Sequence, residues 1–389
     1  MDTFEAINFL KTKTKKIQEF ELINLNDAKD RILFEDLRAE FDSPAFDNSA
    51  LDGYAFAYAN KDNPLKIKGS IFAGDLEEYK INDDECYKIM TGAKMPKNAD
   101  TVLMLEDECL ENGALIIKTD IKKFNVNRKK AEEFKKGEIL LKKGTMLKAS
   151  HIALLASQGK YKIKVFRKIK ICIFSSGNEL KEPFESKKDA QIYNANAYSI
   201  MAILNHPCFE INYKGIIQDT VSECKNAINT KDCDLIITSG AASVGEADFM
   251  KQALFELGFE CLLSNIKAKF IKPSKFFAKD NKFVFVLPGN PISAIFSCFL
   301  LVKSFLFFTL EQSNFFAVKT CKFKGEINLK GGRNELFLGN IKDKHFIQSK
   351  QNSSYMLSIL SKNEYLLISK IDKKEIKNDE DVSVIKLDF

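Results

Sequence analysis

The chain has 389 residues, of which 45% are hydrophobic and 29% are charged. This length is sufficient for two to four domains with at least one large core, and this composition excludes a wholly disordered chain. The 59 basic residues outnumber the 53 acidic ones, but they are spread along the sequence rather than gathered in a basic arm. A solvated, lysine-rich surface is therefore a better interpretation than nucleic-acid binding, and small anionic ligands remain open.

The cysteines, the histidines and the apolar segments indicate a cellular setting. The nine cysteines include no C-x-x-C pair, so we expect reduced, mostly buried thiols and a cytoplasmic protein. Among three histidines, only His206-Pro207-Cys208 resembles a metal motif, and a structural role fits it better than zinc. The N-terminus is too polar for a signal peptide. The apolar segment 292–302 is shorter than a membrane span, so we expect a buried helix and no membrane contact.

Three kinds of sequence pattern follow one another along the chain. Residues 50–165 give short β-like runs, such as 66–69 and 101–104, separated by frequent turn signals. Residues 166–310 alternate apolar strands with longer helical patterns, which is typical of a parallel α/β sheet. Residues 318–389 return to short strands and turns.

The middle pattern contains three strand–loop–helix units. Apolar runs at 170–174, 234–237 and 283–287 lead into loops at 175–180, 238–248 and 288–291. These loops are rich in Gly, Ser, Pro and Asn, and in a doubly wound sheet they gather at the carboxyl ends of the strands, where ligands bind. Asn290 is expected to cap the following helix, with Pro291 at its first position. Backbone N–H groups at helix starts suit anions, so the three loops predict a phosphate-bearing ligand, although none matches a P-loop or dinucleotide fingerprint.

Four carboxylates lie in or beside these loops, at Glu179, Asp219, Glu246 and Asp248. Acids repel phosphates, but Mg²⁺ accepts one or two carboxylates together with phosphate oxygens and would reconcile the two. The alternative is that some of these acids cap helices. Capping is strongly suggested for Asp248, which directly precedes a helical pattern, and it is at least as good as ligand binding for Asp219. Both interpretations stay open at this point.

A series of ordered motifs resembles the molybdopterin molybdenumtransferases, the family that inserts molybdenum into the molybdenum cofactor and includes the C-terminal domain of gephyrin. The motifs are PAFDNSALDGYA at 44–55, TGAKMP at 91–96, ADTV at 99–102 with Glu106-Asp107, the segment 128–133, KPSK at 272–275, and the three loops described above. The resemblance covers nearly the whole chain.

The resemblance implies an α/β multidomain fold, with a doubly wound molybdopterin-binding α/β domain, additional β-rich domains and an elongated N-terminal domain. The expected parts are an elongated domain at 1–48 and 137–168, a β-rich domain at 49–136, the molybdopterin-binding domain at 169–310, and a C-terminal β domain at 318–389. A homodimer is also implied, in which a cleft joins the α/β domain of one subunit to the β-rich part of the other.

The implied reaction is insertion of molybdenum from molybdate into adenylylated molybdopterin, with release of AMP. Other proteins of molybdenum cofactor biosynthesis are implied as partners. Catalytic roles are implied for Asp52, Thr91, Glu179, Asp219 and Asp248. Ligand binding is implied for Ser176, Gly177, Ser239, Gly240, Ser243, Gly245, Pro288, Gly289, Asn290 and Pro291. Molybdate would contact Lys272 and Lys275, and Mg²⁺ would contact Asp52, Glu179 and Asp219.

The sequence departs from the family pattern at a few positions, and two alternative functions follow from partial resemblances. Asn178 replaces a usual aspartate, Ala241 and Ser274 replace glycines, and Leu338 replaces a common arginine. A molybdopterin adenylyltransferase is one alternative, because the α/β region alone resembles those enzymes, but they lack an N-terminal half with the motif at 44–55. A gephyrin-like scaffold is the other alternative.

Overall fold

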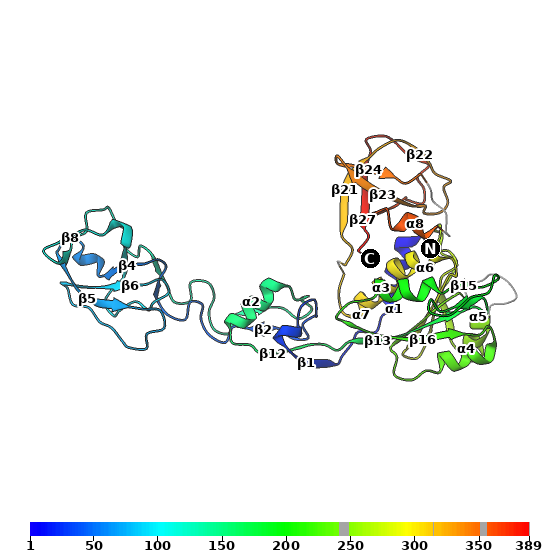
Figure 1. Ribbon diagram of the computed structural model, residues 1–389, viewed down its shortest axis with the longest axis horizontal. Coiled ribbons are helices and arrows are strands. Elements are labelled where there is room, and N and C mark those ends of the chain that lie inside the picture. Colours follow the sequence, from blue (N-terminus) through cyan, green and yellow to red (C-terminus); the bar gives the residue numbers. More distant parts are fainter. Residues whose placement is uncertain (241–248, 314, 351–355, 389) are drawn as a thin grey trace. The chain divides into compact units, whose positions relative to one another are not determined.

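The computed structural model describes residues 1–240, 249–313, 315–350 and 356–388 (Figure 1). The chain forms two compact units. The first unit comprises Met1–Phe34, Met146–Lys148 and Ile163–Phe389, and the second comprises Glu35–Thr145 and Ala149–Lys162. The finer division into four parts stays a prediction, because these units are distinguished by compactness alone.

The second unit is built mainly from short strands. Its six-stranded sheet has the order β7-β4-β6-β5-β9-β8. The bounds are β4 (Gly53–Phe56), β5 (Leu65–Ile71), β6 (Glu85–Ile89), β7 (Thr101–Met104), β8 (Leu110–Glu111) and β9 (Ala114–Leu115). The remaining elements are β2 (Leu37–Arg38), which pairs with β11 (Ile139–Leu141), β3 (Asn48–Ser49), which pairs with β10 (Asn127–Arg128), and α2 (Ala149–Ser157). Tyr54 and Phe56 pack on one face of the sheet and Ala55 on the other, so apolar side chains cover both faces.

The first unit contains a second six-stranded sheet, with the order β16-β13-β17-β20-β19-β18. Its strands are β13 (Ile169–Ser176), β16 (Phe209–Ile217), β17 (Leu235–Ser239), β18 (Glu260–Leu263), β19 (Lys275–Lys279) and β20 (Lys282–Leu287). Strands β16, β13, β17 and β20 are parallel to one another, whereas β19 is antiparallel to both of its neighbours. The three loops that follow β13, β17 and β20 therefore lie at one edge of the sheet.

Helices cover both faces of this sheet. They are α1 (Thr3–Lys13), α3 (Ala195–Ile203), α4 (Val221–Ile228), α5 (Phe249–Glu256), α6 (Pro291–Ser297) and α7 (Lys303–Thr309). Ile171 and Ile173 belong to the core that contains residues of α1, α3, α6 and α7, whereas Cys172 and Phe174 belong to the core with α4 and α5. Figure 1 shows α3 and α4 on opposite sides of β13 and β16. Strand side chains alternate between two apolar layers, and the predicted doubly wound sheet is confirmed.

The apolar helix after β20 is longer than the sequence indicated. Helices α6 and α7 join through a π-helical segment, Cys298–Val302, into one helix at Pro291–Thr309. By length and composition this 19-residue helix could cross a membrane, but its apolar window is entirely buried within the protein. The expected buried helix is confirmed, although the helix continues through Lys303 and beyond the apolar segment 292–302. That lysine is 8% exposed, and its ammonium donates to Asp388 Oδ1 at 2.7 Å.

The C-terminal part of the first unit is a closed barrel with the order β21-β24-β23-β25-β27. Its bounds are β21 (Val318–Phe323), β23 (Leu336–Lys342), β24 (His345–Gln348), β25 (Tyr365–Ile368) and β27 (Asp381–Lys386). The smaller elements of this C-terminal part are β22 (Ile327–Asn328), which pairs with β26 (Glu375–Ile376), and α8 (Leu357–Leu360). Elsewhere in the chain, β1 (Phe20–Asn24) pairs with β12 (Lys162–Phe166), and β14 (Leu180–Lys181) pairs with β15 (Ile192–Tyr193). Leu338 is buried in the core shared with α6, which explains why an apolar residue suits this position.

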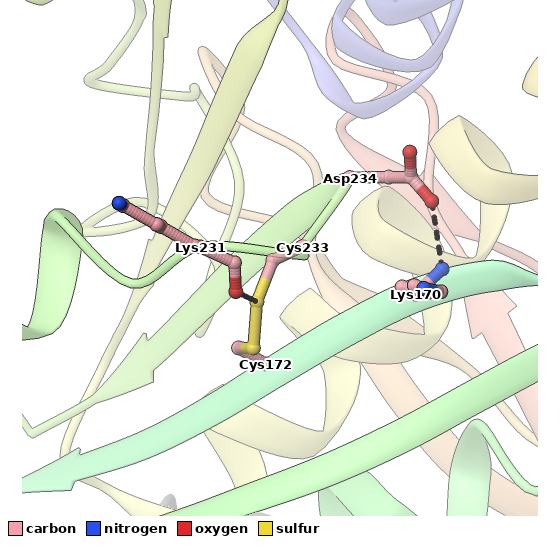
Figure 2. The surroundings of a disulfide bond; sticks show 5 residues. All are labelled: Lys170, Cys172, Lys231, Cys233 and Asp234. Carbon is pink, nitrogen blue, oxygen red and sulfur yellow. Dashed lines mark hydrogen bonds between the residues drawn. A yellow bond between two sulfur atoms is a disulfide. The ribbon is translucent and has the colours of Figure 1, made fainter.

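One pair of cysteines corrects the expectation that all thiols are reduced. Figure 2 shows Cys172 of β13 joined by a disulfide to Cys233, just before β17. Beside it, the backbone N–H of Lys170 donates to Asp234 Oδ2 at 2.8 Å, and the backbone N–H of Asp234 donates to the carbonyl of Lys170 at 2.8 Å. Arg167 adds a bidentate pair with Asp234, at 2.7 and 2.8 Å. The amino ends of β13 and β17 are thus fastened by covalent, ionic and hydrogen bonds.

We expect this disulfide to stabilise the first unit. It closes a loop with a sequence separation of 61 residues, and cross-links of this kind contribute about 2–4 kcal/mol to the free energy of unfolding. Urea unfolding of the wild type should shift to lower denaturant concentration when dithiothreitol is added. The Cys233→Ser variant should unfold at this lower urea concentration without reductant, and adding dithiothreitol should not change its midpoint. An equal response of both proteins would contradict the cross-link.

Candidate functional site

A cavity of about 660 Å³ opens at the carboxyl edge of the first unit's sheet. Seven residues predicted to act on a ligand line it, namely Ser176, Glu179, Gly240, Pro288, Gly289, Asn290 and Pro291. They come from all three loops, those after β13, β17 and β20. The remaining lining residues are Leu180, Ile192, Tyr193, Asn194, Ala195, Asn196 and Pro273. The predicted convergence of the three loops on one cavity is therefore present in the structure.

The close approach of these loops depends on glycine. Gly240 has a φ of +106°, and a Cβ at this position would lie 1.9 Å from the carbonyl oxygen of Ser176. A Cβ at Gly289 would in turn lie 3.5 Å from the Cα of Gly240. Any side chain at Gly240 would push apart the loops that follow β13 and β17, because a backbone atom cannot move away as a flexible side chain can.

Asp219 faces the first loop and does not cap a helix. The Ser176 hydroxyl donates to Asp219 Oδ1 at 2.6 Å, and the backbone N–H of Asp219 donates to Asn178 Oδ1 at 3.3 Å. The N-cap of α4 is Thr220, whose hydroxyl accepts from the N–H of Glu223 at 3.2 Å. The capping alternative was therefore wrong for Asp219. Asn178, which stands where an aspartate is usual, supplies an acceptor in this contact.

Glu179, in the first loop, lines the cavity, whereas Gly177 and Ser239 lie next to the cavity but do not line it. Both carboxylate oxygens of Glu179 are 2.8 Å from the position that a Cβ of Gly177 would take, so glycine leaves room for this acid. Ser239 is 1% exposed, and its hydroxyl oxygen is 3.3 Å from that of Ser175. These two predicted ligand-binding residues thus shape the wall rather than line it.

Two further predictions concern the start of α6. Pro291 occupies the first turn, as expected from its fixed φ and missing N–H. Asn290 takes the N-cap position, but within the described residues its side chain makes no capping hydrogen bond. The predicted N-cap position of Asn290 is confirmed, but its exposed side chain lines the cavity and does not make the capping hydrogen bond.

Lys272 and Lys275 flank the cavity wall without lining it. Pro273, between them, is a lining residue, and Lys275 begins β19 opposite Val286 of β20. Lys272 is exposed and Lys275 is half-buried. Ser274 is 1% exposed, and its hydroxyl lies 2.6 Å from that of Ser297, which donates to the carbonyl of Ser293. The serine that replaces a usual glycine is thus satisfied inside the fold.

Asp52 and Thr91 form a separate polar pair in the second unit. Asp52 Oδ1 accepts from both the backbone N–H and the hydroxyl of Thr91, each at 2.7 Å. These bonds, the backbone one first, hold the pKa of Asp52 below its usual value and so favour the ionised carboxylate. The following Gly53 permits a close pairing of β4 with β7, because a Cβ there would lie 1.9 Å from the carbonyl oxygen of Leu103.

Sequence reasoning missed the wall formed by residues 192–196. Ile192 and Tyr193 are exposed, Asn194 is the N-cap of α3, and Asn196 donates from Nδ2 to the carbonyl of Gly289 at 2.8 Å. The only available signal was an asparagine ahead of an apolar helical pattern, which indicates a cap but no cavity.

Other predicted site residues lie outside the described residues, namely Ser243, Gly245, Glu246 and Asp248, together with Ala241. In the part of the chain that is described, no three His, Cys, Asp or Glu side chains gather closely enough to hold a metal ion by themselves. If only the described residues are considered, a cation at this site would need further ligands, such as phosphate oxygens.

Known proteins resemble this chain in sequence. Residues 1–159 match the MoeA N-terminal region (domain I and II), and residues 172–307 match a probable molybdopterin binding domain. The chain is 35% identical over 288 residues to molybdopterin molybdenumtransferase of Haemophilus influenzae, covering 73% of this chain and 71% of that protein. It is 31% identical over 314 residues to the same-named protein of a Nostoc species, covering 78% and 72%.

Solved structures show the same architecture. A molybdopterin biosynthesis protein from Pyrococcus horikoshii aligns with a TM-score of 0.83 at 27% identity, covering 99% of this chain and 98% of that one. A second structure from this organism aligns with a TM-score of 0.85 at 24% identity over the whole of both chains. The predicted multidomain α/β fold is thereby confirmed. By its motifs, its fold and its relatives, this chain belongs to the molybdopterin molybdenumtransferase family.

Proposed function

We propose that this protein inserts molybdenum from molybdate into adenylylated molybdopterin and releases AMP. Membership of a transferase family supports a role in molybdenum cofactor biosynthesis. The observation that carries the finer proposal is the cavity of about 660 Å³ in which three loops meet beside Glu179 and close to Asp219. Its size suits a ligand as large as a pterin with attached phosphates.

The loops would bind the phosphates and the acids would balance the charge. Backbone N–H groups at the start of α6 suit phosphate oxygens, because the positive end of the helix dipole lies there. Glu179 and Asp219 would otherwise repel a phosphate. Glu179 belongs to the first loop and Asp219 is hydrogen-bonded to that loop, so the two acids fit a Mg²⁺ ion that keeps phosphate and water ligands, and this ion would neutralise the phosphates when bound. Asp219 would be oriented for this by the hydroxyl of Ser176.

Catalysis on this proposal is mainly a matter of position and charge. The two dithiolene sulfurs replace one oxygen of molybdate, which takes up two protons and leaves as water. Water then cleaves the phosphoanhydride and releases AMP. Lys272 and Lys275 flank the cavity residue Pro273 in the sequence, and they are proposed to attract the molybdate dianion. Placing the two reactants in one cavity would lower the entropic part of the barrier.

We also propose that the protein acts as a homodimer, in which Asp52 and Thr91 of one subunit serve the cavity of the other. The low pKa of Asp52 keeps this carboxylate charged, as a role toward Mg²⁺ or the substrate requires. Contact with other proteins of molybdenum cofactor biosynthesis belongs to the same proposal. An adenylyltransferase is a weaker candidate, because the match to the family extends through residues 1–159. No specific observation favours a scaffold role.

The direct test is an assay of the purified protein with adenylylated molybdopterin, Mg²⁺ and molybdate. We expect AMP to be released together with protein-bound or product-bound molybdenum, and the amounts should be equal. Replacing molybdate by tungstate compares the two oxyanions. Formation of adenylylated molybdopterin from ATP and molybdopterin, without metal insertion, would instead identify an adenylyltransferase.

Mixed dimers test the shared site. Asp52→Asn and Glu179→Gln remove one charge each with little change of shape, so each homodimer should lose most of its turnover. A heterodimer of the two variants should recover activity, because one of its two sites carries both acids. Activity should approach half that of the wild type. Light scattering that gives a monomer at micromolar concentration would refute the shared site.

Lys275→Ala should impair the use of molybdate while leaving molybdopterin binding nearly unchanged. A charge-assisted contact contributes about 1.5–3 kcal/mol, so we expect KM for molybdate to rise roughly ten- to hundredfold. Lys279→Ala is a matched control in the same strand, because the Lys279 ammonium instead donates to the carbonyl of Leu257 at 2.7 Å. Equal molybdate dependence in all three proteins would place Lys275 outside the oxyanion site.

Thr91→Ala should raise the pKa of Asp52 toward its ordinary value. The backbone N–H of residue 91 still donates, so the rise should be partial, and Thr91→Ser should show none. Because activity on this proposal needs the ionised acid, the acidic limb of the pH–rate profile should move to higher pH in Thr91→Ala. Carbon NMR titration of the Asp52 carboxylate measures the shift directly. An unchanged pKa would contradict the assigned hydrogen bond.

A further inference from the structure

We propose that Asn194 is a positioning residue for the transfer reaction, which it supports by fixing the three ligand loops relative to one another. The proposal rests on the proposed function, because its test uses the same substrate. Asn194 is 1% exposed, lines the cavity and stands at the N-cap of α3. A cap alone would need only one of its hydrogen bonds, whereas the structure shows several.

The side-chain oxygen of Asn194 connects α3 to β13 and β17. It accepts from the backbone N–H of Ala197 at 3.3 Å and from the Ser175 hydroxyl at 3.0 Å. A hydroxyl carries one hydrogen, so Ser175 accepts from the Ser239 hydroxyl, whose oxygen is 3.3 Å away. Ser175 is fully buried and Ser239 is 1% exposed. Two buried hydroxyls at the ends of β13 and β17 are thereby joined to the start of α3.

The side-chain amide nitrogen of Asn194 makes a second connection. Its Nδ2 donates to the hydroxyl oxygen of Tyr213 on β16 at 2.7 Å, and the Tyr213 hydroxyl donates to Glu182 at 2.5 Å. These contacts fix which end of the amide is oxygen and which is nitrogen, because Nδ2 alone carries hydrogens. The backbone N–H of Asn194 also donates to the carbonyl of Lys181 at 2.8 Å. Asn194 therefore has hydrogen bonds to β13, β14 and β16 as well as within α3.

The helix that Asn194 fixes holds the third loop. Asn196, in the first turn of α3, donates from Nδ2 to the carbonyl of Gly289 at 2.8 Å. Gly289 is packed against Gly240, which itself lies against the carbonyl of Ser176. A change at Asn194 would thus loosen the loops after β13, β17 and β20 together. Lys272 and Lys275 take no part in these contacts, so the effect should fall on the molybdopterin substrate and spare the oxyanion.

The test compares Asn194→Ala with Asp2→Ala in the molybdenum insertion assay. Asp2 is the N-cap of α1 in the same unit and accepts from the N–H of Glu5 at 2.8 Å, so its loss matches the loss of a cap. Both variants should have lower melting temperatures. We expect Asn194→Ala to raise KM for adenylylated molybdopterin at least about tenfold, as loss of two or more hydrogen bonds requires, with KM for molybdate unchanged. Asp2→Ala should alter neither KM.

Two conservative variants keep the proposal testable if Asn194→Ala does not fold. Asn194→Asp retains acceptors for Ser175 and Ala197 but loses the donor to Tyr213, whose single hydroxyl hydrogen already goes to Glu182, so KM for adenylylated molybdopterin should rise about as much as in Tyr213→Phe. Tyr213→Phe removes one partner only, and KM for adenylylated molybdopterin should rise by about three- to tenfold. An unchanged KM in Asn194→Ala, or in Tyr213→Phe when the first variant is unfolded, would overturn the positioning role. A wild-type protein that neither binds nor converts the substrate would instead overturn the proposed function.

Discussion

The contact between Gly240 and the carbonyl of Ser176 constrains the candidate site more than any other single interaction. It brings the ends of β13 and β17 to backbone distance, and Gly289 then packs on Gly240 to complete the wall. This approach is possible only because the strands are neighbours in a parallel sheet whose two faces are both covered. The chemistry proposed for the cavity therefore depends on glycine conformation at one position and on burial of alternating side chains along two strands.

Much of the first unit could be predicted because its patterns are local. The apolar runs at 170–174 and 283–287 are buried strands of the sheet, and Pro291 begins the helix that follows. The loops could be assigned to one edge because parallel strands oblige it. Burial of 171 and 173 on one face and 172 and 174 on the other explains why these strands show no polar alternation.

The remaining features depend on partners far away in the chain. Asp219 could have capped α4, but Thr220 does so, and Ser176 holds Asp219 from 43 residues away. Residues 192–196 line the cavity only because the tertiary fold brings them next to loops that are distant in the sequence. The helix after Pro291 continues beyond 302, and its buried Lys303 pairs with a carboxylate far along the chain, at Asp388. Cys172 and Cys233 lack a recognisable spacing, and their bond follows from the adjacent amino ends of β13 and β17. Periodicity carries none of this information.

The two-sided burial of β17 also has a consequence for how the length of this chain can vary. Inserting or deleting one residue in the strand would turn every later side chain to the opposite face, so that Ile236 and Ile237 would exchange their layers. The same shift of register would move Gly240 away from Ser176 and put a residue with a side chain in its place. Homologous proteins that keep this fold should therefore have no insertion or deletion within this strand, whereas point substitutions that preserve side-chain volume remain permitted.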